Sequence, residues 1–451
     1  MTRTRVLAVL AAALTLSLSL AAADAAMARG TITYDGHTMT FHGDAGGDIV
    51  SVGPSQGELA WVTSGIDAAP AECTTDPYVD YLAYCPWPQR IVVQLGGGDD
   101  RFSIGGSPWD PFPAHIVVEA SGGDGNDRLQ SAQVQDGGAG NDKLEGHDGS
   151  QVLHGGPGDD EVSGLAGSDQ VYGDEGNDTV SGDTHKTASP DVIDGGPGVD
   201  TIGQDWQDLA GAPLVVTLGG GADDGRPGEG DDVRNVENLK GFSHGRFVGT
   251  DGPDSIEVVQ STGPSDLSGL GGDDSLNASD GNDRLDGGAG ADSLDGGFGD
   301  DTIVGGPGQD SISGDTPQGE CGIYFCKLPS GNDTIDARDG ERDSVTCGVG
   351  ADSVKADPQD TVAPDCEQVD RGAGSDPKHK TVKGKRCVVP KLRGLKLKAA
   401  KKKLTKAGCK TKVRKASSRR VRRGKVMGQS ARAGKRLKRG ATVTVTVSRR
   451  R

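Results

Sequence analysis

The chain has 451 residues, of which 74 are glycine, about twice the average ~7% share, and only 4% are aromatic. Its formal net charge is −18, and beyond the first residues no apolar stretch approaches the ~20 residues of a spanning helix. These features exclude a multi-spanning membrane protein and leave little material for a large aromatic core.

Residues 1–28 have the pattern of a secretion signal peptide. Arg3 and Arg5 form a basic start, Val6 to Ala22 is apolar, and Ala23-Asp24-Ala25 and Ala26-Met27-Ala28 are candidate cleavage sites. A single membrane anchor is the alternative, although the run is short for a spanning helix. We expect a secreted, extracellular protein with no membrane span after signal cleavage.

Eight cysteines fall into pairs that are close in sequence. In an exported chain an even number favours disulfide bonds, and no Cys-x-x-Cys couples to a second such pair as a metal site would require. Sequence does not fix the pairing, and we predict the local pairs Cys73–Cys85, Cys321–Cys326, Cys347–Cys366 and Cys387–Cys409.

Residues 29–115 are interpreted as an N-terminal β cap, with a ligand-binding domain as the rival. Thr31 to Phe41 alternates polar and apolar residues, and Ile49 to Val52 and Ile91 to Leu95 are strand-like. Gly43 to Asp48 and Gly96 to Phe102 already approach the repeat described next. A stack of repeats needs a cap because its terminal unit exposes unpaired strands.

Residues 116–370 contain a nine-residue period. From Gly269 to Ser313 the nines are GLGGDDSLN, ASDGNDRLD, GGAGADSLD, GGFGDDTIV and GGPGQDSIS, with Gly at position four, Asp at position six and an aliphatic residue at position eight. Glycines predict a tight turn, and Asp-x-Leu/Ile-x predicts a short strand. Such a period indicates one unit stacked on copies of itself.

One aliphatic side chain per nine residues is a thin core, and aligned carboxylates repel one another. A hard cation between the turns would solve both problems, since Ca²⁺ takes six to eight oxygen ligands from carboxylates and carbonyls.

The nines resemble the repeats-in-toxin nonapeptide GGxGxDxUx, a Ca²⁺-binding repeat. This resemblance implies a mainly β protein, a parallel β-roll with two nonapeptides per turn and Ca²⁺ as the cofactor between repeats n and n+2. It also implies that the Asp at position six gives the carboxylate. The predicted metal ligands are Asp127, Asp142, Asp160, Asp169, Asp178, Asp200, Asp274, Asp283, Asp292, Asp301, Asp310 and Asp333.

Three parts of the repeat region depart from the pattern. Gln151 replaces the expected Asp, so that site should be weak or empty. Residues 204–248 form an insertion, with a strand at Pro213 to Leu218 and an acidic loop that we interpret as solvated, an extra Ca²⁺ site being the alternative. Asp343, Asp352 and Asp360 keep the spacing without the glycines, and we expect these rungs to carry little metal and form a disulfide-stapled cap.

The net charge of the chain changes from negative to positive near Arg371. Residues 377–451 hold 30 Lys and Arg and no Asp or Glu, which leaves 18 basic and 66 acidic residues, a net charge of −48, in the preceding part. Residues 371–386 have linker composition. From Val389 the pattern VPxLxGxxLxxA predicts a helix with Leu397, Ala400, Leu404 and Ala407 on one face, ended by Gly408, and Thr442 to Val447 is predicted as an edge strand.

Residues 387–449 resemble the PASTA domain in this opening, in GKVMGQ and in AGKRLKRGATVTVTVS. The resemblance implies a small α+β module associated with cell walls, some members of which bind peptidoglycan. Peptidoglycan, anionic wall polymers and the acidic roll itself are open as partners of the basic charge, as is a purely solvated surface. Export argues against a specific nucleic-acid partner.

We predict no enzyme. Gly53-Pro54-Ser55-Gln56-Gly57 fits G-x-S-x-G, but a nucleophile elbow needs a following helix, and Pro54 and the β pattern oppose one. The leading hypothesis is a secreted Ca²⁺-binding protein that folds on binding Ca²⁺ outside the cell and is held at the envelope by its basic module. The alternatives are an adhesin or surface protein whose roll is a spacer, and a degenerate secreted hydrolase using Ser55.

Overall fold

The computed structural model describes residues 29–372, except 56–57, 64, 77, 79–80, 106–111, 184–188, 204–212, 222–223, 242, 260–262 and 316–330, and residues 387–449, except 394, 408, 418–424, 433–434 and 438–441. The predicted signal peptide, most of the linker, Gly408 and the pair Cys321–Cys326 lie outside this set. The chain divides into two compact units, Met1–Gly374 and Ser375–Arg451. None of the described helices is long and apolar enough to cross a membrane.

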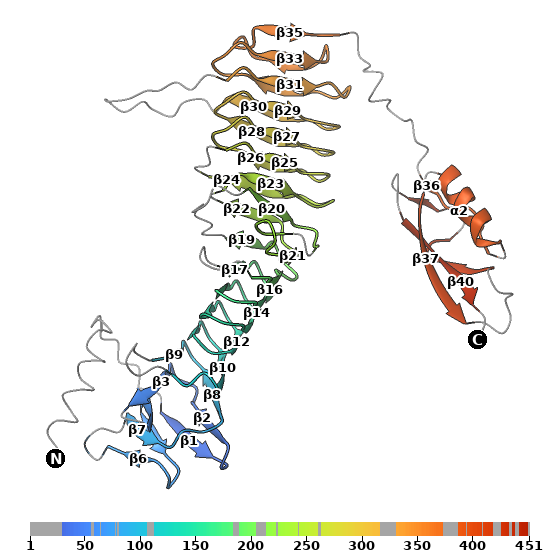
Figure 1. The fold of residues 1–451 in the computed structure, drawn as a ribbon. Coiled ribbons are helices and arrows are strands. Elements are labelled where there is room, and N and C mark those ends of the chain that lie inside the picture. Colours follow the sequence, from blue (N-terminus) through green and yellow to red (C-terminus); the bar gives the residue numbers. More distant parts are fainter. Residues whose placement is uncertain are drawn as a thin grey trace, which may run out of the picture. The chain divides into compact units, whose positions relative to one another are not determined.

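The first unit is a parallel β-roll in which short strands stack rung on rung (Figure 1). It confirms the predicted fold class, and three sheets form its walls. The first sheet has the order β5 (Ile66–Ala68), β1 (Gly30–Tyr34), β2 (Thr38–His42), β8 (Arg90–Gly97), β10 (Val117–Asp124), β12 (Val134–Ala139), β14 (Val152–Pro157), β16 (Gln170–Glu175), β18 (Val192–Asp194) and β21 (Asp232–Arg234).

The second sheet runs along the whole roll. It begins with antiparallel strands and continues with parallel ones. Its strands, each paired with the next, are β6 (Thr74–Thr75), β7 (Leu82–Cys85), β4 (Glu58–Thr63), β3 (Ile49–Ser55), β9 (Arg101–Ile104), β11 (Arg128–Gln130), β13 (Lys143–Glu145), β15 (Glu161–Leu165), β17 (Thr179–Asp183), β19 (Thr201–Gly203), β22 (Asn238–Gly241), β24 (Ser255–Val258), β26 (Ser275–Asn277), β28 (Ser293–Gly297), β30 (Ser311–Asp315), β32 (Ser344–Thr346) and β34 (Thr361–Val362).

The third sheet begins inside the predicted insertion, where the first sheet ends. Its parallel strands are β20 (Leu214–Thr217), β23 (Gly245–Val248), β25 (Asp266–Ser268), β27 (Arg284–Asp286), β29 (Thr302–Val304), β31 (Thr334–Ala337), β33 (Ser353–Ala356) and β35 (Gln368–Asp370). Isolated antiparallel bridges join the regions of β20 and β21, such as the one between Gly219 and Arg234. The insertion therefore breaks the nine-residue period but keeps the stack continuous through β22 in the second sheet.

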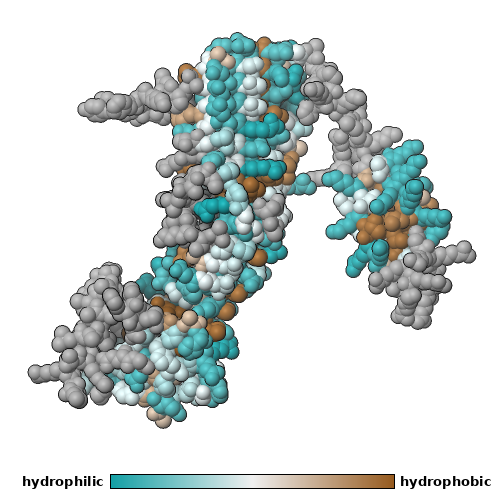
Figure 2. All heavy atoms as spheres, in the orientation of Figure 1, coloured by the Kyte–Doolittle hydropathy of each residue, from teal (hydrophilic) through white to brown (hydrophobic). Residues whose placement is uncertain are grey.

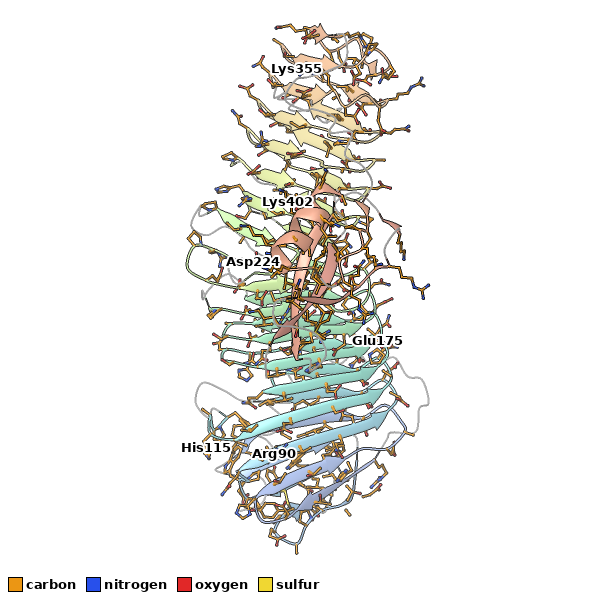
Figure 3. All side chains as sticks on the ribbon, turned by 90° about the vertical axis from the view of Figure 1, so that its right-hand side faces the viewer. Arg90, His115, Glu175, Asp224, Lys355 and Lys402 are labelled. Carbon is orange, nitrogen blue, oxygen red and sulfur yellow. A yellow bond between two sulfur atoms is a disulfide. The ribbon has the colours of Figure 1, made fainter. Side chains whose placement is uncertain are left out.

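The register shows two repeats per turn of the roll. Leu144 pairs with Val162, and Leu276 pairs with Leu294, each eighteen residues further along the chain. The position-eight side chains consequently stack in columns inside the roll, where Leu144, Leu285 and Ile303 are no more than 1% exposed. Outward-facing side chains line the strands (Figure 3), and the face visible in Figure 2 is mainly hydrophilic or neutral. Stacking thus completes a core that no single nonapeptide could form.

Position two of the repeat has a left-handed backbone in most of the described rungs, with His147 and Thr250 as exceptions. Gly138 and Gly156 have φ near +105°, and Leu165 and Leu270 have φ of 74° and 71°. L-residues avoid this region because Cβ approaches the following carbonyl, so glycine is favoured there. The same turn geometry is therefore kept at rungs where leucine replaces glycine.

The predicted cap region is joined to the roll without a break. β1 and β2 form a hairpin, and β2 pairs with β8 of the first sheet, while β3 pairs with β9 of the second. Trp61 and Phe41 are buried between the sheets with ring centroids 6.2 Å apart. The core of this region therefore contains large aromatic side chains, whereas the core of the repeats is mainly aliphatic.

Two of the four predicted disulfides are confirmed. Cys73 is bonded to Cys85, and Cys347 to Cys366. Cys409 is also disulfide-bonded, whereas the side chain of Cys387 lies outside the described set. The Cys347–Cys366 bond ties the loops of the last rungs, as predicted.

The second unit is a small α+β module. Helix α2 (Leu397–Lys406) buries Ala400 and Leu404. The core of the module also includes Val443 and Val445. The strands are β36 (Cys387–Val388), β37 (Lys410–Ser417), β38 (Val426–Gln429), β39 (Arg436–Leu437) and β40 (Thr442–Arg449).

The prediction that Thr442 to Val447 forms an edge strand is wrong. β40 is central, parallel to β37 on one side and antiparallel to β38 on the other. The alternation of Thr and Val indicates that one face of the strand is buried. It does not indicate whether one or both edges of the strand are paired.

Candidate metal centre

The position-six aspartates form hydrogen-bonded ladders along the turns. The backbone N–H of Asp142 donates to Oδ1 of Asp160 at 2.7 Å, and the N–H of Asp160 donates to Oδ1 of Asp178 at 2.8 Å. These side chains lie at the start of each strand, because the residue that follows begins the pairing. Each carboxylate therefore links its own turn to the turn stacked against it earlier in the chain. We call each aspartate of such a ladder, with its turn, a rung.

Four such ladders are present in the described residues. Two precede the end of the insertion and two follow it. They run through Asp48, Asp100, Asp127, Asp142, Asp160, Asp178, Asp200 and Glu237; through Gln151, Asp169, Asp191 and Asp231; through Asp254, Asp274, Asp292, Asp310, Asp343 and Asp360; and through Ser265, Asp283, Asp301, Asp333, Asp352 and Glu367.

The second carboxylate oxygen of most rungs has no hydrogen-bond partner among the described residues. Oδ2 is buried and unsatisfied in Asp100, Asp127, Asp142, Asp160, Asp178, Asp200, Asp274, Asp283, Asp292, Asp301, Asp310, Asp333, Asp343 and Asp352. A buried carboxylate oxygen without a partner is costly. Its regular recurrence therefore points to a ligand rather than to isolated imperfections.

A backbone carbonyl oxygen lies near these unsatisfied carboxylate oxygens in several turns. A Cβ added to Gly137 would lie 2.3 Å from Oδ2 of Asp142 and 2.5 Å from the carbonyl oxygen of Gly155, and a Cβ on Gly155 would meet Asp160 and Gly173 in the same way. Glycine at position one thus leaves room for carboxylate and carbonyl oxygens to converge. In the described part of the chain, no group of three or more His, Cys, Asp or Glu side chains is arranged to hold a metal ion. A carboxylate oxygen beside a backbone carbonyl oxygen is a donor set that fits a hard cation such as Ca²⁺.

Burial makes these carboxyl groups hard to ionise without a cation. Desolvation, opposed by the backbone hydrogen bond and reinforced by neighbouring carboxylates, raises the pKa of Asp301 to about 8 and that of Asp160 and Asp310 to about 7. The same causes raise the pKa of Asp142 and Asp274 to about 6. A fully ionised ladder is therefore electrostatically unfavourable unless positive charge lies beside it.

All twelve predicted ligand residues lie in the ladders. Asp127, Asp142, Asp160, Asp178 and Asp200 share the first, Asp169 lies in the second, Asp274, Asp292 and Asp310 in the third, and Asp283, Asp301 and Asp333 in the fourth. The ladders hold each aspartate beside its neighbour one rung away and do not bring the twelve to a single point.

Several ladder members are not among the twelve predicted ligands. Asp100, in the predicted cap, continues the first ladder, and Asp254 begins the third. Asp343 and Asp352 keep a buried, unsatisfied Oδ2 although their turns lack the glycine pattern. The signal that could have found them is an aspartate two residues before a buried aliphatic or aromatic side chain, as in Asp100 and Phe102.

Gln151 fills its own site. Its Nε2 donates to the carbonyl oxygen of Gly149, and its Oε1 accepts the backbone N–H of His147 at 3.2 Å. Its backbone N–H still donates to Oδ1 of Asp169 at 2.8 Å, so the ladder continues. Both polar atoms of the Gln151 side chain are therefore satisfied within its own turn.

The prediction of a solvated acidic loop in the insertion is wrong. Asp224, Glu229 and Asp231 are no more than 4% exposed. Asp224 accepts the backbone N–H groups of Thr217 and Val233, and Asp231 accepts that of Asp191. These carboxylates are buried because they satisfy backbone donors where the sheets change over (Figure 3 labels Asp224).

The G-x-S-x-G motif does not form a nucleophile elbow. Ser55 ends β3, and β4 begins at Glu58 and pairs antiparallel with β3. An elbow requires a strand-to-helix turn, which this hairpin replaces.

The second unit presents a cationic surface. Lys398, Lys401, Lys402, Lys403 and Lys406 of α2 are all exposed. The module has no acidic residue, so no carboxylate within it can neutralise them.

Comparison with protein families gives two matches. The RTX calcium-binding nonapeptide repeat matches in four copies, over residues 136–162, 154–184, 262–294 and 286–316, and the PASTA domain matches residues 388–449. No curated protein matches the chain. Neither matched family is enzymatic, and Ca²⁺ is the cofactor that the repeats indicate. The chain thus contains RTX calcium-binding repeats followed by a PASTA domain, a module related to the cell wall.

Proposed function

We propose that this is a secreted protein whose roll folds when Ca²⁺ binds outside the cell, and whose basic module retains it at the cell envelope. The single observation that carries the first part is the recurring buried Oδ2 with no hydrogen-bond partner in the described residues. The twelve aspartates predicted from sequence would hold the metal, together with backbone carbonyls of the glycine turns. Bound Ca²⁺ would supply the positive charge that these oxygens lack.

The chain's own residues explain why folding would depend on the metal. The ladders draw aspartates into a buried column, where raised pKa values such as that of Asp301 oppose ionisation at neutral pH. A cytosol poor in Ca²⁺ would keep the acidic segment extended, and extracellular modules of this kind bind Ca²⁺ with affinities of about 10⁻⁴–10⁻³ M. Export and folding would then occur in the correct order.

Circular dichroism of the mature chain tests this part. We expect a cooperative gain of β signal on titration with Ca²⁺ and none with Mg²⁺, which demands a tighter octahedral site. A chain that is already fully folded in chelator would show that the disulfides and terminal regions suffice, and would overturn the folding switch.

Retention at the envelope rests on the charge of the second unit. Lys398, Lys402 and Lys406 recur every four residues along α2, so they share one exposed face. Such a row favours a repeating polyanion, and we take anionic wall polymers, alone or attached to peptidoglycan, as its partner. Attraction of this kind weakens as salt shortens the Debye length from ~10 Å at about 0.1 M to ~3 Å at about 1 M.

A pull-down with isolated cell walls tests the retention. The full chain should bind at low salt and elute at high salt, and changing Lys398, Lys402 and Lys406 to Gln should weaken binding. The matched control changes three exposed or half-buried roll lysines, Lys143, Lys240 and Lys355, to Gln. Equal loss in both triple variants would mean that general charge and not the module retains the protein, and would favour the roll as a spacer of a surface protein.

A further inference from the structure

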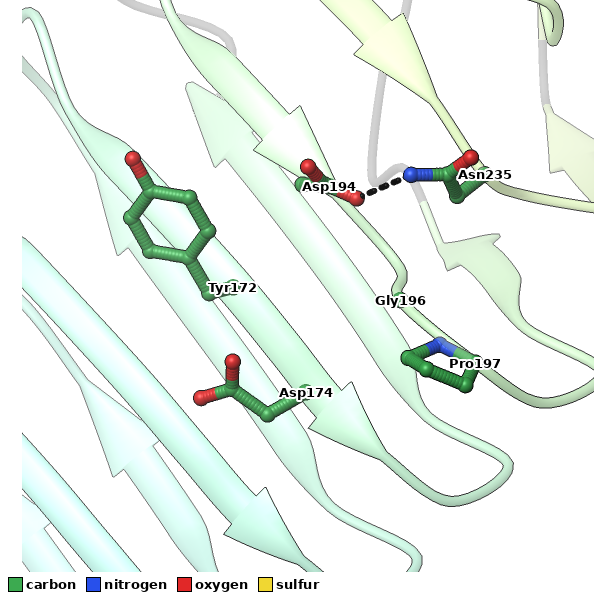
Figure 4. A pocket seen from close by; sticks show the side chains of 6 residues that line it. All are labelled: Tyr172, Asp174, Asp194, Gly196, Pro197 and Asn235. Atoms are coloured by element: carbon green, nitrogen blue, oxygen red, sulfur yellow. Dashed lines mark hydrogen bonds between the residues drawn. The ribbon is translucent and has the colours of Figure 1, made fainter.

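A cavity opens on the outer face of the first sheet, where the regular repeats give way to the insertion. Its volume is about 390 Å³, within the ~300–1,000 Å³ range of small-molecule sites. The lining residues come from β16, from β18 and the turn after it, and from the residue directly after β21 (Figure 4 labels them). They are Tyr172, Asp174, Asp194, Gly196, Pro197 and Asn235.

The aromatic ring of Tyr172 has one covered face. On the three adjacent strands His154, Tyr172 and Asp194 lie directly opposite one another in register. The His154 ring stacks on Tyr172 with centroids 4.5 Å apart and planes 7° apart. The stack fixes the tyrosine and leaves its other face toward Asp194 and the cavity.

Both carboxylates of the cavity are held in place by polar neighbours. Nδ1 of His154 lies 2.9 Å from Oδ2 of Asp174. Nδ2 of Asn235 donates to Oδ1 of Asp194 at 2.7 Å, and Nε of Arg234 lies 3.3 Å from Oδ2 of Asp194. Each carboxylate can accept about four hydrogen bonds, so both retain acceptor capacity for a ligand.

Asp174 occupies a backbone position that suits glycine. It has φ of 71° at position two of its repeat, where Gly138, Gly156 and Gly196 serve in other rungs. Asn235 across the cavity is also left-handed, with φ of 51°. At both positions glycine would suit the backbone better than the residue that is present.

These groups define the chemistry of the ligand. A free anion would be repelled by two carboxylates, and a cation would compete with the Arg234 and His154 partners already beside them. A neutral pyranose fits, since its C–H face can pack on the open face of Tyr172 while hydroxyl groups bond to Asp174, Asp194 and Asn235. We propose that this cavity is a binding subsite for one sugar unit of a neutral oligosaccharide.

This proposal goes beyond calcium-dependent folding and does not rest on the basic module. The probes are neutral tetrasaccharides of four kinds, chito-, cello-, malto- and manno-oligosaccharide, titrated at up to about 10 mM into the full chain with Ca²⁺ present. Calorimetry gives the Kd, and saturation-transfer NMR identifies the sugar protons that lie against an aromatic ring. Salt of about 1 M suppresses charge effects of the second unit.

Two variants and one control make the test specific. Tyr172→Ala should weaken binding about tenfold, because it removes the ring face. Asp174→Gly should weaken it about fivefold while leaving the fold as stable or more so, since glycine suits the left-handed turn. Tyr78→Ala, which changes a tyrosine that is 93% exposed and far along the chain, should leave the Kd unchanged.

Each result is decisive for this site. Saturable binding of at least one tetrasaccharide, weakened by both variants, supports the subsite. No saturable binding of any probe by a chain with full β signal overturns it and leaves calcium-dependent folding intact. Binding that both variants leave unchanged, or binding of spermidine in place of the sugars, also overturns it. A chain that folds and binds sugar in chelator would instead contradict the folding switch alone.

Discussion

The backbone N–H of Asp292 donates a 3.0 Å hydrogen bond to Oδ1 of Asp310, while Oδ2 of Asp310 is buried without a hydrogen-bond partner among the described residues. Oδ1 of Asp310 thus stabilises the stack, and its Oδ2 is the candidate ligand for a cation. The pKa of Asp310 rises to about 7 because desolvation outweighs that hydrogen bond. The pair combines a structural bond with a candidate metal ligand in a single carboxylate.

Replacing Asp292 and Asp310 together with Ala should lower the Ca²⁺ stoichiometry by about one or two ions and raise the folding midpoint roughly tenfold, because calcium affinity depends on ligand charge. Equilibrium dialysis and circular dichroism measure the two quantities. Asp148→Ala is the control, as its side chain is exposed and outside the ladders. Unchanged stoichiometry in the double variant would contradict the site assignment.

Gln151→Asp should add about one Ca²⁺ ion, since it removes the Nε2 donor that satisfies the Gly149 carbonyl and restores a carboxylate. The reverse change, Asp160→Gln, in the next nonapeptide and on the first ladder, should remove about one. The two variants should therefore move the stoichiometry in opposite directions. If both leave it the same, side chains at position six do not determine metal occupancy.

Stability of the metal-free roll should fall as pH rises from about 4 to about 8. The relevant carboxyl groups have an unfolded pKa near 3.9 and folded values of about 6 to about 8, as for Asp274 and Asp301, so the folded state binds more protons in this window. In chelator the β signal should be larger at pH 5 than at pH 8.

The affinity for Ca²⁺ should show the opposite trend, rising across the same window, because metal must displace these protons. Calorimetry in buffers of different ionisation enthalpy should detect proton release on Ca²⁺ binding. A metal-free chain that becomes more stable as pH rises would contradict the burial of protonated ladder carboxyls.

Leu270→Gly should stabilise the Ca²⁺-bound roll by about 1 kcal/mol, because Leu270 is held at φ of 71° and is 49% exposed, so it loses little buried area. Leu270→Ala should give no such gain, since alanine keeps the Cβ that is unfavourable there. Urea unfolding of the three proteins distinguishes the effects. Equal stability of the Gly and Ala variants would show that backbone strain is absent at this turn.

Much of the roll could be predicted because its signal repeats. An aspartate followed two residues later by an aliphatic side chain fixes both the turn and the strand, so Asp142 with Leu144 and Asp292 with Leu294 lie where the period places them. The local pairs Cys73–Cys85 and Cys347–Cys366 were also predictable, since the loops that they close are short.

Features that depend on distant partners were not predictable. The central place of β40 is decided by β37 and β38, which its own alternation does not encode. Burial of Asp224 and Asp231 arises from backbone donors brought to them by the change of sheets. The pocket at Tyr172 needs the register of three strands and the return of the chain at Asn235, which no local pattern announces.

The first sheet ends at β21 and the third begins at β20, whereas the second sheet passes this point unbroken through β19, β22 and β24. In a stacked array each rung is coupled mainly to its neighbours, so a rung with one continuous wall is the weakest link. We therefore expect the roll to unfold under force in two parts, one on each side of the insertion. Pulled from its ends in an optical trap, it should yield in two separate extensions, with the insertion marking the boundary between them.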